Sequence, residues 1–533
     1  MDSETDLVRV QTALLSVHDK AAVLDFARRL SSCGVRIIAS AGTASYLRSN
    51  DISCDALEDV AGTQELAGGR VKTLHPTVYA AILADRADPA HMADLQRLGV
   101  SPIDLVCTSL YPFEEIVALA GVLTEDIVEN IDIGGPSMVR AAAKNHAWVG
   151  VVTDKSQYES VAAEIAETGG LSLETRVRLA REAFVRTCRY DAAIATWMEG
   201  RLNELEEGVI ERTEREREAA KLPRDLLLPL WRRMLLRYGE NPHQAGGFYE
   251  LYGSASLLSE ASVLGGKELS FNNLLDLDAA WSLATSFSEP AAVIVKHTNP
   301  CGAATASNVE RAYSMALECD PVSAYGGVVA FNRKVDLATA QRITEIFTEV
   351  VAAPDFERSA LSKLSSKKSL RIVKMPFGKV PFELFLKSSL GGFIVQTPDE
   401  LEDDSEWKVV SALSPSREML DALRFAWRVC ASTKSNSVVI ARGTQAVGIG
   451  AGDQSRVGAA EKAIKQAGER AKGAVAASEA FFPFRDGVDV LAAAGVLAVV
   501  QPGGSVRDEE VIRAADEAGM VMIFTGRRHF RHG

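Results

Sequence analysis

Short apolar segments alternate with helical ones over the first 200 residues, and this alternation restricts the fold more than any other feature. Thr12–Val17 (TALLSV) is expected to form a buried strand, and Lys20–Leu30 carries apolar side chains at helical spacing. Val35–Ser40 (VRIIAS) is expected to form the next strand, and a second helix should open at Ala41–Thr43. This order predicts a parallel sheet with helices on its faces. Ligands of such sheets bind beyond the carboxyl ends of the strands.

Length and composition exclude several classes of protein. The chain has 533 residues, and a scale of about 150 residues per domain suggests three or four folding units. A net charge of −13 argues against a general nucleic-acid surface. The most apolar stretch, Val490–Val500, is shorter than the roughly 18 residues of a membrane span. There is no signal-peptide pattern, and the seven cysteines form no C-x-x-C pair, so we expect a cytoplasmic protein without a disulfide framework.

The second part of the chain suggests an internal repeat. Residues 201–223 are dense in charge, which is typical of a solvated helix face and also predicts a boundary between two large parts. Beyond it, Ala292–Phe331 and Val438–Phe482 each contain a strand, a glycine-containing loop, a helix and a second strand. The shared order is a weak indication of two related subdomains.

The segment Gly69–Pro76 (GRVKTLHP) could bind phosphate. In an extended segment Arg70 and Lys72 would share one face, with Thr73 and His75 close by. Two cations and a hydroxyl suit a phosphate monoester. By spacing alone, a basic pair on the surface is the more common explanation.

The segment Asn130–His146 (NIDIGGPSMVRAAAKNH) predicts a helix that begins near two glycines. Gly134 opens a permissive turn, and Pro136 suits the first helical position. The N-terminus of such a helix offers N–H groups to an anion. Arg140 and Lys144 are four residues apart and share a face, which fits either a ligand site or an ordinary solvated helix.

The segment Ile294–Gly302 (IVKHTNPCG) is the best candidate for catalysis. A buried-looking strand runs into Lys296 and His297. Histidine can accept a proton near neutral pH, and lysine can stabilise a developing negative charge. Adjacent strand residues point to opposite faces, so both can serve one site only if the strand breaks here. We expect Pro300 to stop the strand and Gly302 to let the backbone turn.

The sequence argues against zinc and against NAD. Zinc deaminases carry H-x-E and P-C-x-x-C, whereas His297 is followed by Thr298 and Asn299, and no second cysteine follows Cys301 at that spacing. The glycines of Gly448–Arg456 (GIGAGDQSR) do not match G-x-G-x-x-G, and no acid follows at the dinucleotide spacing. Glycine-rich turns and phenylalanines in the last third could instead hold a flat heteroaromatic ligand.

Taken together, the motifs resemble the bifunctional purine biosynthesis family that joins AICAR formyltransferase to IMP cyclohydrolase. The markers occur in the family's order: SVHDK, ASAGT, GRVKTLHP, SLYPF, NIDIGGP, RAAAKNH, LRYGENPHQ, KELSFNNLLDLDAAW, VKHTNPCG, DPVSAYGGVVAF, SNS, GIGAGDQSR, FFPFRDG and PGGS. The resemblance implies an α/β protein with a methylglyoxal-synthase-like parallel domain at residues 1–200 and a charged linker at 201–224. Two cytidine-deaminase-like transformylase subdomains without zinc would follow, at 225–385 and 386–533.

The resemblance also implies the activity. The family transfers a formyl group from 10-formyltetrahydrofolate to AICAR and then closes formyl-AICAR to IMP with loss of water, the last two steps of de novo IMP synthesis. The AICAR amine is a poor nucleophile, so the transfer needs a base and a cation near the oxyanion. Ring closure joins tethered groups, so holding one conformer supplies much of the acceleration. A homodimer is implied, with a transformylase site built from both chains, and no nucleic-acid or membrane partner.

Residue roles carry over where the motifs match. Lys296 and His297 are implied to be the transition-state stabiliser and the proton acceptor of formyl transfer. Lys144, Tyr111 and Lys72 are implied to be catalytic in ring closure. The implied AICAR contacts are Arg237, Tyr238, Gly326, Glu349, Asn436, Arg456, Phe481 and Arg528. The implied folate side comprises Phe481, Asp486 and Ser505. The implied nucleotide contacts of the cyclohydrolase are Lys20, Ser40, Gly42, Thr43, Arg70, Thr73, Asp132, Ile133 and Gly134.

Four residues in the N-terminal part depart from the family pattern. The family usually has Ser at His18, Gly at Ala41, His at Tyr79 and Asn at Ser109. These changes leave open a transformylase whose cyclohydrolase is weak or inactive. A non-enzymatic sensor of phosphate ligands is a further alternative, since a fold does not fix a function.

Overall fold

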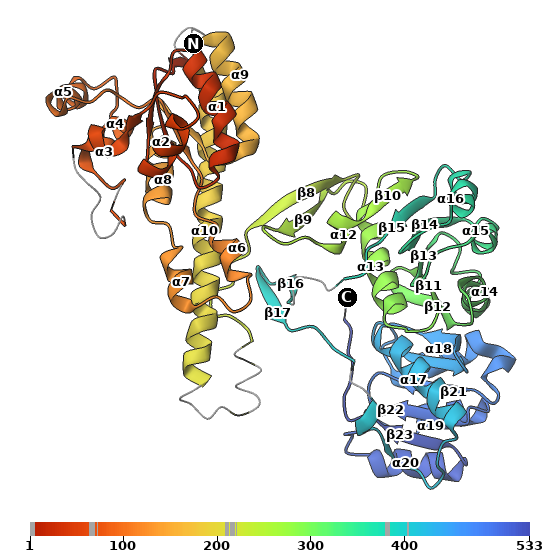
Figure 1. Ribbon diagram of the computed structural model, residues 1–533. Helices are drawn as coiled ribbons and strands as arrows, with labels where there is room; N and C mark the ends of the chain where they lie inside the picture. The colour runs from red at the N-terminus through yellow and green to blue at the C-terminus, as the bar shows by residue number, and fades with distance from the viewer. Residues whose placement is uncertain are drawn as a thin grey trace. The chain divides into compact units, whose positions relative to one another are not determined.

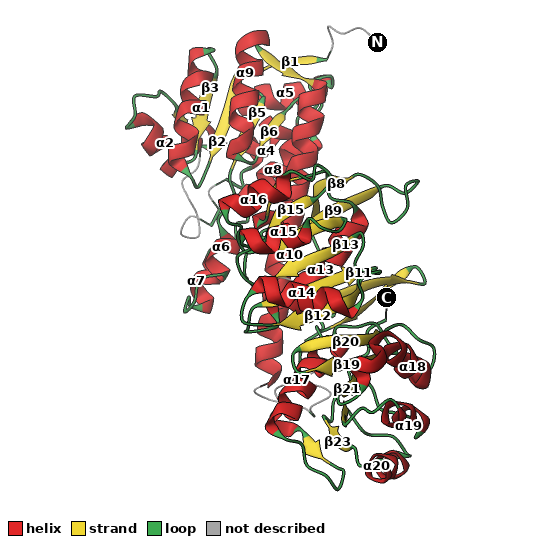
Figure 2. Ribbon diagram, turned by 90° about the vertical axis from the view of Figure 1, so that its right-hand side faces the viewer, coloured by secondary structure: helices red, strands yellow, loops and turns green. Residues whose placement is uncertain are grey.

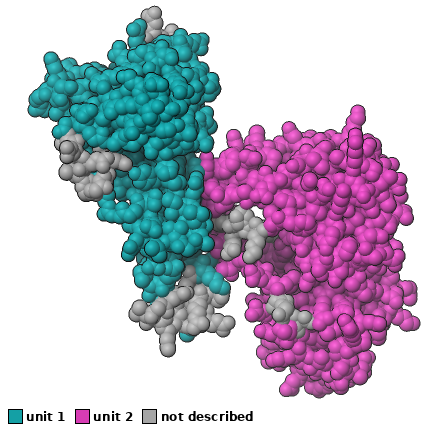
Figure 3. All heavy atoms as spheres, viewed as in Figure 1, with its two compact units in different colours: residues 1–229 teal, residues 230–533 magenta. Residues whose placement is uncertain are grey.

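The computed structural model describes residues 6–62, 70, 71, 73–207, 213, 219, 221–378, 384–401 and 404–532. The chain divides into two compact units, Met1–Pro229 and Leu230–Gly533 (Figure 3). Each unit buries hydrophobic cores of its own. Each unit therefore positions functional side chains on its own elements.

The N-terminal unit contains a five-stranded sheet whose neighbouring strands are all parallel. In spatial order its strands are β4 (Asp55–Ala56), β3 (Arg36–Ala39), β2 (Thr12–Ser16), β5 (Leu105–Thr108) and β6 (Gly150–Val152). Leu14 and Leu15 point to opposite faces of β2, and both are fully buried, so both faces of the sheet are covered. The predicted parallel sheet is confirmed, and β2 and β3 lie within one residue of the expected strands.

The helices of this unit begin and end largely at sequence signals. They are α1 (Lys20–Ser32), α2 (Ala41–Arg48), α3 (Leu57–Ala61), α4 (Pro76–Leu83), α5 (Pro89–Leu98), α6 (Phe113–Val117), α7 (Thr124–Glu129), α8 (Gly134–Lys144), α9 (Tyr158–Thr168) and α10 (Leu173–Glu207) (Figure 1). Asp19 caps α1 by accepting a hydrogen bond from the Ala22 amide. Strands β1 (Leu7–Arg9) and β7 (Gly170–Ser172) form a separate antiparallel pair.

Helix α10 is 35 residues long and runs into the segment expected to be a linker. Residues 201–207 are its last turns. Most of residues 208–220 lie outside the described part of the chain. The division between the two units falls after Pro229.

The C-terminal unit contains one twelve-stranded sheet. In spatial order its strands are β10 (Ser262–Gly265), β15 (Arg371–Lys374), β14 (Thr348–Ala353), β13 (Gly327–Phe331), β11 (Ala291–Lys296), β12 (Asn299–Thr305), β20 (Gln445–Gly450), β19 (Val438–Arg442), β21 (Val475–Ser478), β22 (Ala498–Gln501), β23 (Val521–Phe524) and β18 (Lys408–Val409) (Figure 2). The two halves of the sheet meet where β12 pairs with β20.

The two halves repeat one order of elements: a helix, a hairpin, and then three further helix–strand units. The helices of the first half are α13 (Phe271–Thr285), α14 (Val309–Cys319), α15 (Leu337–Ile343) and α16 (Arg358–Ser365), and those of the second are α17 (Arg417–Ala431), α18 (Arg456–Ala467), α19 (Asp486–Ala493) and α20 (Asp508–Glu517). In both halves the hairpin is antiparallel and the last three strands are parallel. The predicted repeat is confirmed, and it is longer than the sequence indicated.

The first helix of each half shows the repeat in its side chains. Leu277 and Trp281 of α13 match Leu423 and Trp427 of α17 in position along the helix. All four are buried in one shared core on the same side of the sheet. The helices α14–α16 and α18–α20 belong to two separate cores, one for each half.

Two antiparallel hairpins complete this unit. They are β8 (Leu230–Leu236) with β9 (Gly246–Leu251), and β16 (Phe385–Ser389) with β17 (Gly392–Gln396). A short helix, α12 (Leu257–Glu260), follows β9. Among the residues that the structure describes, no helix combines the length and the apolar composition required to cross a bilayer.

Candidate active sites

In the N-terminal unit, polar side chains gather where β2, β3 and β5 end. The Ser16 hydroxyl, at the end of β2, lies 3.1 Å from the Ser40 hydroxyl that follows β3. Thr43 is buried, and its Oγ1 accepts a hydrogen bond of 3.3 Å from the Val17 amide. This edge is the position at which ligands of parallel sheets bind.

The first turn of α2 faces a lysine from α1. A Cβ added at Gly42 would lie 3.4 Å from Lys20 Nζ, so the ammonium group sits beside the start of α2. Ser40 is the N-cap residue, but its side chain makes no capping hydrogen bond. The N–H groups of this turn and the Lys20 charge together suit an anion such as phosphate.

The start of α8 lies against Thr73. A Cβ added at Gly134 would lie only 2.2 Å from Thr73 Oγ1, so glycine permits this close approach. Asp132 Oδ1 accepts a hydrogen bond of 2.8 Å from the Gly135 amide, and the Asp132 amide donates to the Tyr190 hydroxyl at 2.7 Å. The turn that leads into α8 is therefore held rigidly. Ile133, between them, is exposed.

Two of the four departures from the family pattern touch one another. The His18 amide donates a hydrogen bond of 2.6 Å to the Ser109 hydroxyl. The His18 ring packs edge-on against Tyr111, with 5.9 Å between ring centroids. A third departure, Tyr79, lies in the same unit, where burial raises the pKa of its hydroxyl to about 12, and Asp132 adds to this effect. His18, Ser109 and Tyr111 thus form one cluster beyond the ends of β2 and β5.

The remaining residues expected at this site are placed less closely. Arg70 forms an ion pair with Glu129, and Lys72 lies outside the described residues. Lys144 is the last residue of α8, an eleven-residue helix, so its backbone lies about 15 Å along the axis from Gly134. The structure does not bring Lys144 to the start of α8. Pro136 was expected at the first helical position, but it is the third residue of α8. A proline is tolerated there, because the N–H groups of the first helical turn have no partner within the helix.

In the C-terminal unit, the chain reverses at the two residues between β11 and β12. Lys296 pairs with Asn299, and the turn consists of His297 and Thr298, with φ of +52° and +62°. The expected break after Lys296 is confirmed. Positive φ at both central residues is the geometry of a type I′ turn.

The expected roles of Pro300 and Gly302 are wrong. The hairpin turn reverses the chain before Pro300, which lies inside β12 next to a bulge at Cys301, where a proline is tolerated. Gly302 is also inside β12, and a Cβ there would lie 2.0 Å from the carbonyl oxygen of Ala316 in α14. Gly302 is therefore needed for close packing of a helix on the sheet.

Lys296 is fixed beside Gly326. Its Nζ donates hydrogen bonds to the carbonyl oxygens of Tyr325 and Gly326 at 3.0 and 2.9 Å. Gly326 has φ of +71°, and a Cβ there would lie 3.0 Å from that Nζ. The ammonium group has a third N–H that these bonds leave for a ligand. Glu349, in β14, forms an ion pair with Arg371.

The second half contributes a buried charged network. The Arg456 guanidinium donates to the Asn436 side-chain oxygen at 2.8 Å and to the Ser437 carbonyl oxygen at 2.9 Å, and it forms an ion pair with Glu479. The Arg456 and Glu479 side chains are 5% and 0% exposed. Ser437 donates from its amide and hydroxyl to the same carboxylate, each at 3.0 Å. The network fixes Asn436 in place.

The two halves of the sheet meet beside the His297–Thr298 turn. The Lys434 amide donates a hydrogen bond of 3.0 Å to Asn299 Oδ1, directly after the turn. Burial lowers the pKa of Lys434, and the nearby charges of Arg531 and Lys387 add to this effect. Asp276 and Glu240 act in the opposite direction on this pKa, so the surroundings of Lys434 carry charges of both signs.

Other expected ligand contacts lie on loops. In the β8–β9 connection, the Arg237 guanidinium lies over the Tyr238 ring, 5.4 Å from its centroid. The Asn272 side-chain amide, from α13, donates a hydrogen bond to the Glu240 carbonyl oxygen of the same connection. Phe481 is half-buried in the connection between β21 and α19. The contacts of Asp486, Ser505 and Arg528 are local. The Asp486 carboxylate accepts from the Gly487 amide, the Ser505 amide donates to Asp508, and Arg528 stacks on Phe530.

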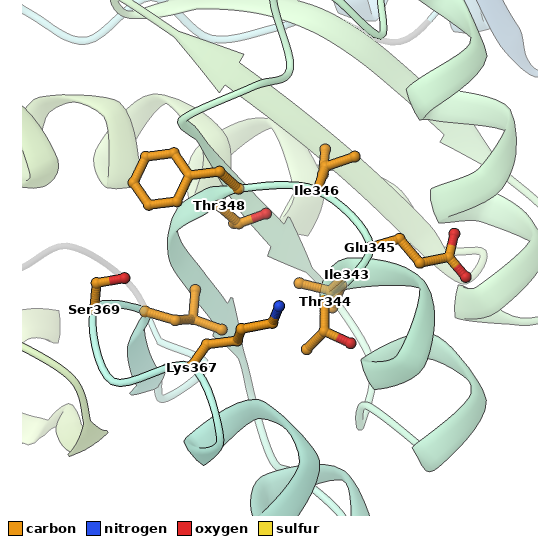
Figure 4. Close-up of a pocket in the computed structure, with 9 residues that line it drawn as sticks. Ile343, Thr344, Glu345, Ile346, Thr348, Lys367 and Ser369 are labelled. Atoms are coloured by element: carbon orange, nitrogen blue, oxygen red, sulfur yellow. The ribbon is translucent and has the colours of Figure 1, made fainter.

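A cavity of about 170 Å³ lies between the connection from α15 to β14 and the loop before β15 (Figure 4). Thr348 lines it, and since neighbouring strand residues face opposite sides, Glu349 points away from it. The Lys367 ammonium points into it between Ser369 and Thr344, close to the end of α15. Sites for drug-sized ligands usually span about 300–1,000 Å³, so this cavity is too small for a nucleotide.

The sequence reasoning missed Asp276, Lys434 and Glu479. Asp276 Oδ1 accepts a hydrogen bond of 2.6 Å from the Thr298 amide, within the His297–Thr298 turn. For Asp276 and Glu479 the available signal was an acid inside an apolar stretch, as in LLDLDAAW and GAVAASEAFF, because such acids are rarely left without a partner.

Comparison with known proteins gives consistent matches along the chain. Residues 142–466 match the family model described as AICARFT/IMPCHase bienzyme, and residues 22–137 match that of the MGS-like domain. The chain is 47% identical over 529 residues to "Bifunctional purine biosynthesis protein PurH" of Persephonella marina, covering 98% of this chain and 99% of that protein. The protein of that name from Sorangium cellulosum is 49% identical, over 98% of this chain and 100% of its own length. The one from Bacillus cereus is 42% identical, over 98% of this chain and 99% of its own length.

Proposed function

Because the chain belongs to the AICARFT/IMPCHase bienzyme family, we propose that its two units divide the two reactions of that family between them. The chain is a bifunctional purine biosynthesis enzyme, with AICAR formyltransferase and IMP cyclohydrolase activities. In this proposal the C-terminal unit transfers the formyl group and the N-terminal unit closes the ring. The observation that carries it is the turn that joins Lys296, held on Gly326, to His297.

His297 is proposed as the base of formyl transfer. The AICAR amine attacks the formyl carbon of the folate, which we infer to be 10-formyltetrahydrofolate. His297 takes the amine proton. The bond from the carbon to the folate nitrogen then breaks as the carbonyl re-forms, and the protonated His297 returns that proton to the departing nitrogen. The third N–H of Lys296 stabilises the oxyanion in between.

Residues of both halves are proposed to hold the substrates of this step. Asn436 and Arg456 have fixed polar groups that suit the AICAR carboxamide and ring, because buried polar networks leave few alternative geometries. The remaining proposed AICAR contacts are Arg237, Tyr238, Gly326, Glu349, Phe481 and Arg528. The proposed folate side is Phe481, Asp486 and Ser505.

Ring closure is proposed at the strand ends of the N-terminal unit. Lys20, the start of α2 and Thr73 hold the phosphate, and Asp132 with Gly134 fixes the base, so that the tethered formyl and amide groups meet. Ser40, Gly42, Thr43, Arg70 and Ile133 are the other proposed contacts. Tyr111 and Lys72 are proposed as catalytic. Lys144 keeps this role as a proposal, and it requires a separate test because of its distance from Gly134.

The experiment is a turnover assay that starts from AICAR and 10-formyltetrahydrofolate and follows both products. We expect IMP. Folded protein that forms neither formyl-AICAR nor IMP would overturn the proposal. Formyl-AICAR that accumulates without IMP would select a transformylase with a weak cyclohydrolase, which the changed cluster of His18, Ser109 and Tyr111 favours as the second candidate.

Gly134→Ala should lower kcat for ring closure by about 10-fold or more, because small displacements of bound groups have large effects on rate. The new methyl group would lie 2.2 Å from Oγ1 of Thr73, whose side chain is buried. Gly200→Ala is the matched control, since a Cβ at that helical glycine meets nothing within 4 Å. Ring closure is measured with supplied formyl-AICAR. Equal rates for both variants would remove Gly134 from the site.

A homodimer is proposed from the hairpin β16–β17. Its tip and second strand expose apolar groups, with Leu390 and Phe393 exposed to 106% and 71%, and Ile394 to 59%. A lone two-stranded hairpin is marginally stable in water, so a second copy of this chain is a reasonable cover for it. We expect Phe393→Asp to shift the sedimentation profile toward monomer. Leu119→Asp, which places the same charge at an apolar position outside the hairpin that is 63% exposed, should leave the profile unchanged. A wild-type monomer at micromolar concentration would contradict the dimer.

A further inference from the structure

The repeat provides an internal comparison for the catalytic turn. The hairpin β19–β20 occupies the place in the second half that β11–β12 occupies in the first. Its turn passes through Gly443, with φ of +54°, and Thr444. The catalytic turn instead has His297 and Thr298, both at positive φ. A left-handed conformation is unfavourable for an L-residue, and a β-branched residue there is unusual, so other contacts must hold this turn.

The strongest of these contacts comes from α13. Asp276 Oδ1 accepts the Thr298 amide at 2.6 Å, within the turn itself. Helix α13 is a rigid support, because Ser270 and Asn273 form a reciprocal capping box at its start and its apolar face is buried in the core. Burial raises the pKa of Asp276, while the amides of Thr298 and His297 and the charges of His297 and Lys296 oppose that rise.

The second half lacks this contact. Helices α13 and α17 have the same length and each follows a capping serine, Ser270 or Ser416. At the position of Asp276, the second helix has Ala422, which is buried. The acid is therefore present where the turn has two non-glycine residues at positive φ, and absent where the turn has glycine. Only the first half therefore breaks the preference for glycine at positive φ, and such departures are expected at functional sites.

We propose that Asp276 is a positioning residue for formyl transfer: its carboxylate holds the Thr298 amide, and thereby keeps the His297–Thr298 turn in the conformation that presents His297 to the AICAR amine. The inference rests on the proposed role of His297. Asp276 acts through the turn and does not touch the substrate.

The test measures kcat and KM for formyl transfer in Asp276 variants of the full-length chain. Asp276→Ala should lower kcat by about 100-fold, since a misplacement near 1 Å has this effect, and leave KM for AICAR within about threefold. Asp276→Asn should retain activity within about fivefold, because its amide oxygen can still accept the Thr298 N–H. The double change Asp276→Ala with Thr298→Gly should recover at least about tenfold of the loss, because glycine adopts positive φ without strain.

Two controls separate the possible failures. Asp421→Ala in α17 removes an exposed acid that pairs with Arg424 and should leave kcat unchanged. His297→Ala tests the underlying function. If His297→Ala is inactive and Asp276→Ala has wild-type kcat, the positioning role is overturned alone, whereas an active His297→Ala overturns the base itself. If Asp276→Ala fails to fold, the Asn and Thr298→Gly variants decide: an inactive Asn variant, or no recovery with glycine, rejects the proposal.

Discussion

Replacing His297 by alanine should lower kcat for formyl transfer by about 10²–10⁴-fold, the usual contribution of a positioned general base. The AICAR amine gives up its electrons poorly, so attack on the formyl carbon requires that its proton leave. His297 is exposed in the turn between β11 and β12, so its removal should disturb little packing. The change to alanine removes the imidazole ring and leaves the backbone hydrogen bonds of the turn in place, so the protein should remain folded.

The same preparation provides the control. Ring closure is proposed for the other unit, so supplied formyl-AICAR should still give IMP at the wild-type rate. Lys296→Met should reduce formyl transfer to a similar degree, because it removes the charge that opposes the oxyanion while keeping the length of the side chain. A His297→Ala enzyme within threefold of wild type, measured at saturating AICAR, would show that another group accepts the proton.

Much of the architecture follows from local patterns. The strands β2 and β3 are continuous apolar runs that lead into helices, and the sheet they form is parallel, as predicted. The internal repeat was visible only as an order of elements, and the matching Leu277, Trp281, Leu423 and Trp427 make it concrete. These features depend on residue type and spacing, which the sequence displays directly.

The errors around Pro300 and Gly302 have one physical origin. A proline and a glycine close together are typical of a turn, but here the turn is made two residues earlier by His297 and Thr298, neither of which favours it. Tertiary contacts overrode the local preference: Asp276 holds the turn, and α14 requires a glycine in β12. Contacts between residues far apart in the chain cannot be read from spacing.

The same limit applies to the site. The Lys296–His297 pair could be chosen from chemistry, whereas the support of Lys296 by Gly326 depends on how β11 and β13 pair. Lys144 shows the reverse case, since its helix was predicted but its distance from Gly134 becomes clear only once the bounds of α8 are known. Residue types therefore suggest roles, and the fold decides which of them can act together.

Replacing Arg456 by methionine should lower the free energy of unfolding of the C-terminal unit by about 3–5 kcal/mol. Arg456 and Glu479 are both buried, and within the described residues the guanidinium is the only cation that pairs with this carboxylate. Methionine would fill part of the space but leave Glu479 as a buried charge bonded only to Ser437. Removing one member of a buried ion pair is costly because the other charge stays out of water without compensation.

The double change Arg456→Met with Glu479→Gln distinguishes this cause from lost packing. It removes both charges, so it should recover more than half of the loss, and a double-mutant cycle in urea measures the coupling between the two positions. Arg485→Met is the matched control, because its ion pairs with Asp489 and Glu517 are solvent-exposed and should contribute far less to stability than the buried pair. If the Arg456 and Arg485 variants lose equal stability, the buried network does not hold the second half together, and the rigid placement of Asn436 must come from another source.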